Sequence, residues 1–138
     1  MRLQSDRLSI TETLKMPLEK IEKFLDDFYF EYQKGDYFFL KDTPDQIHIV
    51  ADIVRGDYRI VSENGSIIDP EDAIPIFSVG TLIEILSTFH NLQLSTFFNG
   101  WFMIWELDII MQSEENDRLV TFLWRILGEI IDDGKFIW

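Results

Sequence analysis

The sequence contains no cysteine and only two histidines, His48 and His90. Disulfides, thiolate metal sites and cysteine nucleophiles are therefore excluded. His48 is followed four residues later by Asp52, and these two residues would form a partial metal pair only if they lay on one helix face. We therefore expect no metal site and no cofactor.

Long apolar runs and catalytic motifs are also missing. No segment approaches the roughly 18 apolar residues that suffice to span a membrane, and residues 1–15 lack the apolar stretch of a signal peptide. The sequence has no glycine-rich phosphate loop and no GxSxG motif. We expect a soluble, cytoplasmic protein that binds no membrane and is not an enzyme.

Basic residues are scarce, because 12 lysines and arginines face 25 acidic residues and leave a net charge of −13. Such a charge disfavours direct contact with nucleic acid and favours a basic or amphipathic protein partner. Glu129, Asp132 and Asp133 fall near the end of a predicted helix, where the helix dipole disfavours negative charge. Since their position adds no stability to the helix, we predict that they bind another protein.

The residues that are present predict one α+β domain spanning 1–138. Three helices, at about 17–34, 78–90 and 114–133, are expected to pack on an antiparallel sheet that includes a β-hairpin at 92–107. Proline at position 17 suits a first helical turn, and Lys34-Gly35 is a typical helix end. Ser78 and Ser113 are expected to cap the other two helices.

Residues 36–68 have the sequence pattern of a β-meander, in which short runs of β-branched and aromatic residues are separated by turn sequences. The segment 44–54 has two interpretations. Its β-branched residues favour a strand, whereas the capping-box pattern at 43–46 favours a helix. We prefer the strand.

The predicted hairpin rests on Asn99-Gly100, a pair that suits a two-residue turn between two apolar runs. A loop of these two residues would place Leu94 opposite Trp105 on the buried face. It would also place Phe97 opposite Phe102 on the outer face near the tip. Either another element covers these two rings or a partner does, so Phe97 and Phe102 are candidate protein-binding residues.

The last predicted helix is apolar around most of its circumference. Such a helix is buried on two sides or presents one side to a partner. Trp124 is therefore a further candidate protein-binding residue, and association of two copies through it or through the Phe97/Phe102 tip is compatible with the pattern.

Residues 74–136 resemble small uncharacterised open reading frames carried by phages and conjugative elements of gut-associated bacteria. The resemblance rests on Ile74-Pro75-Ile76-Phe77-Ser78-Val79, on the apolar helix that follows, and on the acidic-Gly ending Asp132-Asp133-Gly134. Phe77 stands where that group has tryptophan. The resemblance implies an accessory protein of a mobile element and implies no activity.

Together these features predict a small acidic protein that acts by binding another protein, in one version as an acidic mimic of nucleic acid. The alternative is a small-ligand or peptide-binding domain with a pocket between the aromatic hairpin and the C-terminal helix.

Overall fold

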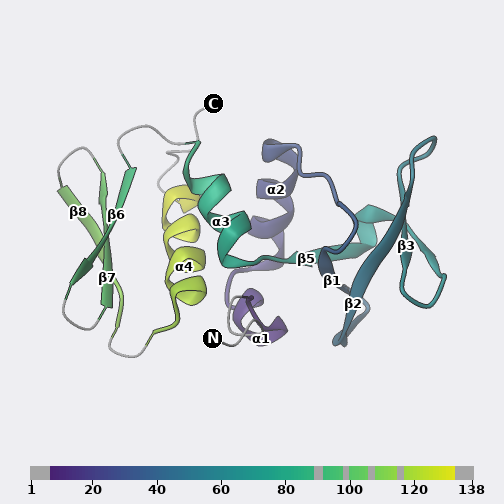
Figure 1. Ribbon diagram of the computed structural model, residues 1–138, viewed down its shortest axis with the longest axis horizontal. Coiled ribbons are helices and arrows are strands. Elements are labelled where there is room, and N and C mark those ends of the chain that lie inside the picture. The colour runs from purple at the N-terminus through teal and green to yellow at the C-terminus, as the bar shows by residue number, and fades with distance from the viewer. Residues whose placement is uncertain (1–6, 89–91, 98–99, 106–107, 115–116, 133–138) are drawn as a thin grey trace. The chain divides into compact units, whose positions relative to one another are not determined.

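The computed structural model describes residues 7–88, 92–97, 100–105, 108–114 and 117–132, and it has the predicted α+β fold (Figure 1). The chain divides into two compact units. The N-terminal unit is Ser9–Phe77, and the C-terminal unit combines Ser78–Trp138 with Met1–Leu8. Each is described by itself.

The N-terminal unit begins with two helices, α1 (Ile10–Thr13) and α2 (Leu18–Phe28). The prediction that the first long helix runs to residue 34 was wrong, because Tyr29 adopts a left-handed conformation with φ 57°. The N–H groups of Tyr29 and Phe30 then donate to the carbonyls of Asp26 and Leu25, which is the usual pattern of a closed helix end. The chain leaves the helix six residues early.

A five-stranded antiparallel sheet follows, in the order β4-β3-β2-β1-β5. Its strands are β1 (Tyr37–Leu40), β2 (Thr43–Val54), β3 (Arg59–Ser62), β4 (Ile67–Ile68) and β5 (Ala73–Ile76). The predicted meander is confirmed, and segment 44–54 is a strand. The sequence did not predict β5, which follows the short 3₁₀ helix η2 (Pro70–Asp72) and pairs with β1. Pro75 is tolerated because β5 is an edge strand.

The core of the N-terminal unit includes aromatic residues from the segment that follows α2. Tyr32 packs with Phe38, Val50, Ile60 and Ala73, which come from four strands of the sheet. The Phe30 ring meets the rings of Tyr32 and Phe77 edge-on, with centroids 4.9 and 5.6 Å apart. The early end of α2 thus places Phe30 and Tyr32 against the sheet.

The C-terminal unit contains helices α3 (Val79–Leu86) and α4 (Leu119–Asp132). Ser78 caps α3 as predicted, and its hydroxyl accepts from the N–H of Thr81. The predicted start of the last helix at 114 was wrong. Ser113 instead accepts the N–H of Trp101 at 2.9 Å, so its hydroxyl belongs to the sheet and α4 starts five residues later than expected.

The predicted hairpin is confirmed as strands β6 (Leu92–Phe97) and β7 (Gly100–Trp105), but its register was wrong by two residues. Phe97 pairs with Gly100, and Leu94 pairs with Met103 instead of Trp105. An additional strand, β8 (Asp108–Gln112), pairs with β7, and the Ser113 bond extends this contact to Trp101. Strand β7 is thus paired on both sides, and Gly100 is its first residue instead of the second residue of the predicted turn. Leu94, expected in the core, is 38% exposed, whereas Met103 is buried.

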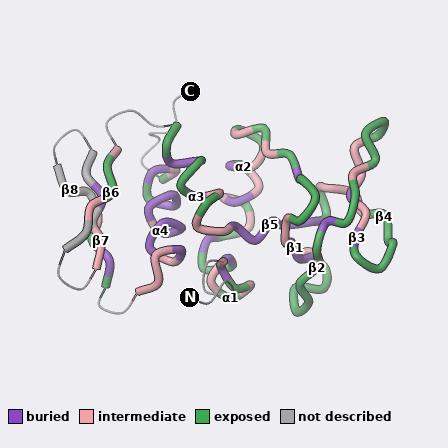
Figure 2. Tube along the Cα trace, viewed as in Figure 1, coloured by how far each residue is buried: buried purple, intermediate pink, exposed green. Residues whose placement is uncertain are grey.

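Helix α4 contacts both α3 and β7, and Figure 2 shows it buried along most of its length. Its apolar circumference therefore packs within the C-terminal unit, on two sides. In the described parts of the chain, no helix has both the length and the apolar character needed to cross a membrane.

Candidate functional site

The predicted hairpin-tip residues lie in the strands, Phe97 at the end of β6 and Phe102 within β7. They do not pair with each other, since Phe97 pairs with Gly100 and Phe102 with Ser95. Their side chains, like the whole of Asp133, lie outside the described residues. The structure therefore corrects the predicted pairing of these two rings.

Helix α4 carries the other predicted binding residues. Glu129 and Asp132 are exposed and lie three residues apart, so they share one stretch of the helix surface. Trp124 is only 3% exposed and belongs to the core. Its side chain therefore provides no surface for a partner.

His48 and Asp52, which would form a partial metal pair only on a helix, do not lie on one. Both residues belong to the strand β2. The His48 ring stacks on Phe38, and its Nδ1 lies 3.1 Å from Oε1 of Glu63. The other Glu63 oxygen accepts the N–H of Ile49, and this bond is the main cause that lowers the pKa of Glu63. This histidine takes part in sheet packing.

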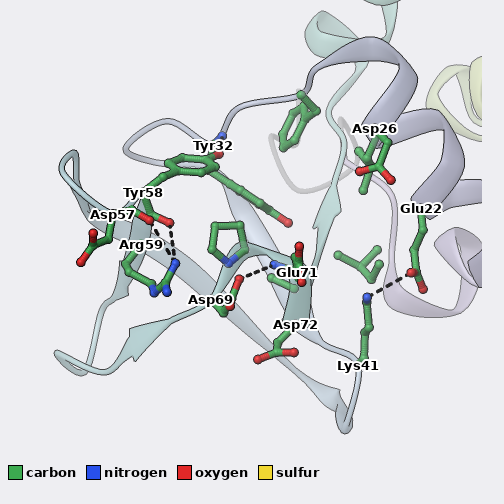
Figure 3. A pocket seen from close by; sticks show the side chains of 15 residues that line it. Glu22, Asp26, Tyr32, Lys41, Asp57, Tyr58, Arg59, Asp69, Glu71 and Asp72 are labelled. Carbon is green, nitrogen blue, oxygen red and sulfur yellow. Dashed lines mark hydrogen bonds and ion pairs between the residues drawn. The ribbon is translucent and has the colours of Figure 1, made fainter.

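A pocket of about 680 Å³ lies in the N-terminal unit, and its lining includes none of the site residues that the sequence suggested (Figure 3). Its walls come from α2, from the turn between β2 and β3, and from η2 with the start of β5. The lining residues are Glu22, Leu25, Asp26, Phe30, Tyr32, Lys41, Asp57, Tyr58, Arg59, Asp69, Pro70, Glu71, Asp72, Ala73 and Ile74. Its volume is within the range of small-ligand sites.

The pocket is strongly acidic, because six carboxylates line it and only Lys41 and Arg59 oppose them. Both cations already have partners. The Lys41 ammonium lies 3.3 Å from Glu22, and Arg59 donates to the backbone carbonyls of Asp57 and Tyr58. Within the described residues, no ion pair neutralises the carboxylates of Asp26, Asp57, Glu71 or Asp72.

Local sequence explains how α2 and η2 each present carboxylates. Glu22 and Asp26 are four residues apart, so α2 presents them on one face. Asp69 caps η2 by accepting the N–H of Glu71 at 3.0 Å. This cap and Pro70 fix the short helix that carries Glu71 and Asp72.

Two tyrosines provide the aromatic part of the pocket, and their hydroxyls differ. The Tyr58 hydroxyl accepts the N–H of Tyr32 at 2.7 Å. The Tyr32 hydroxyl is buried and has no hydrogen-bond partner among the described residues, although Figure 3 shows its side chain extending toward the middle of the pocket. Burial is the main cause that raises the pKa of Tyr32, so the phenol stays neutral.

The arrangement suits an organic cation better than a metal ion. Within the described residues, no three histidines, aspartates or glutamates are close enough to hold a metal. Carboxylates attract a cation over several ångströms, and the faces of Phe30, Tyr32 and Tyr58 belong to the ring type that binds ammonium and guanidinium groups.

The sequence did not predict this pocket. The run Asp69-Pro70-Glu71-Asp72 is acidic, but it lacks the spaced oxygens and the central glycine of a calcium-binding loop, so by itself it indicates only a turn. The sequence offers no sign that α2 and the β2–β3 turn lie beside it. Comparison with known protein families, with curated proteins and with solved structures found no match to this chain.

Proposed function

We propose that this protein is a non-enzymatic binding protein, and that its pocket takes a lysine or arginine side chain from a basic segment of another protein. The observation that carries the proposal is the group of unneutralised carboxylates beside aromatic rings in one pocket. The net charge of −13 supports it, because the field of the chain attracts basic partners.

The resemblance to open reading frames of mobile elements fits an accessory role of this kind, in which the basic partner is a host protein. A version in which the acidic surface imitates nucleic acid is part of the same proposal. Salt should weaken either form of binding, since exposed charges are screened over about 10 Å at 0.1 M.

The test uses the double variant Glu71→Gln/Asp72→Asn, which removes two pocket charges while keeping side-chain size. The matched control is Asp42→Asn/Asp45→Asn, which removes two exposed carboxylates, one just before β2 and one near its start, outside the pocket. Binding of a fluorescent lysine- and arginine-rich peptide is measured by anisotropy. We expect the pocket variant to weaken binding about tenfold or more, and the control to weaken it by less than about threefold. Equal losses in both variants would contradict the proposal.

A second candidate is binding of a free organic cation, such as a diamine. The volume of about 680 Å³ favours it, because this space would enclose a small ligand. Titration with a free diamine at the same ionic strength separates the two candidates. If the diamine binds more tightly than the peptide, the ligand is a small molecule.

A further inference from the structure

The Tyr32 hydroxyl is a buried polar group of the pocket that lacks a hydrogen-bond partner among the residues that the structure describes, so a ligand atom could supply one. The residue is 6% exposed, lines the pocket, and leaves its oxygen without a hydrogen-bond partner in the described part of the chain. A buried hydroxyl without a partner costs free energy of folding, and phenylalanine would fill the same space without that cost. A ligand that bonds to this oxygen would recover the loss.

The charges around the Tyr32 hydroxyl determine which kind of ligand group can bond to it. Six carboxylates line the same pocket, so a negatively charged group would be repelled. A cation that carries N–H groups can donate to the oxygen of Tyr32 while it lies near the carboxylates. The other cation-binding features do not distinguish among cations, because rings and carboxylates attract a quaternary ammonium as well.

We infer that Tyr32 makes the pocket selective for cations with at least one N–H donor, so that it takes lysine, its dimethylated form or arginine and rejects trimethyl-lysine. This inference rests on the proposed function. Dimethyl-lysine and trimethyl-lysine carry the same charge and differ by one methyl group, and the dimethyl form keeps one N–H. The ratio of their affinities therefore reports the hydrogen bond to Tyr32 while the charge stays constant.

The experiment measures the affinities of two otherwise identical basic peptides, one dimethylated and one trimethylated at its central lysine. For the unmodified protein we expect the dimethyl peptide to bind about tenfold more tightly. In Tyr32→Phe this preference should fall to less than about twofold, and the protein should melt at or above the temperature of its parent. Tyr29→Phe is the matched control, and it should keep the preference because the Tyr29 side chain is exposed and does not line the pocket.

Each other outcome is decisive. If neither peptide binds, the proposed function fails and the inference fails with it. If both peptides bind the unmodified protein equally well, the inference is overturned and the proposed function stands. A Tyr32→Phe protein that keeps the preference, or that melts well below its parent, would show that the hydroxyl serves the fold instead of a ligand.

Discussion

The two long helices of this protein, α2 and α4, serve their units in different ways. Eight of the 14 residues of α4 are buried, whereas only Ile21 and Phe24 of the 11 residues of α2 are. Helix α4 is the centre of the C-terminal unit, while α2 is a wall of the N-terminal unit that presents Glu22 and Asp26 to a pocket. An apolar circumference thus indicated packing, whereas the polar face of the amphipathic helix α2 contributes one of the unneutralised carboxylates of the pocket, Asp26.

The first test of this comparison is a substitution of Trp124, where we expect the largest change in the free energy of unfolding. Replacing Trp124 with alanine should remove about 3–5 kcal/mol from the free energy of unfolding, because it opens a cavity in a packed core. Urea unfolding measures this loss. The exposed Glu129 of the same helix is the control, and its alanine variant should stay within about 0.5 kcal/mol of the parent. If the Trp124→Ala protein is as stable as its parent, Trp124 does not belong to the core and could contact a partner.

A smaller effect of opposite sign is expected at the end of α2. Tyr29 is 88% exposed and has a positive φ, which glycine adopts without strain. Tyr29→Gly should therefore raise the free energy of unfolding by about 1 kcal/mol. Tyr29→Ala removes the ring but keeps the strain, so it should bring no such gain. If glycine instead lowers stability more than alanine does, the helix does not end at this residue.

Much of the fold could be predicted from local sequence, because periodicity and turn residues act over short distances. The meander over residues 36–68, the Ser78 cap and the existence of the hairpin are of this kind. The errors came from distant contacts. Tyr29 ends α2 although glycine, the usual residue at such a position, comes only at Gly35, and the ring of Phe30 then packs against Phe77. Ser113 bonds to Trp101 in the sheet instead of capping a helix.

The candidate site could not be predicted from the sequence because it, too, depends on contacts between distant parts of the chain. Its residues come from four separated stretches of the sequence, and no single stretch has the spacing of a known motif. Only the fold brings Asp26 near η2, and only the fold leaves the Tyr32 hydroxyl without a partner. The charge of the chain led to the expectation of a basic partner bound at Glu129, Asp132 and Asp133; this stays a prediction, and the pocket is the alternative place that we propose for such a partner.

The most direct measurement maps where a basic peptide binds. Backbone amide shifts of the ¹⁵N-labelled protein are followed by NMR during titration with the lysine- and arginine-rich peptide. We predict that the largest shifts fall at residues that line the pocket, around Tyr32, Tyr58 and Glu71, and that they are lost in Glu71→Gln/Asp72→Asn. Shifts confined to the stretch of α4 around Glu129 and Asp132, with the pocket residues unmoved, would contradict the account.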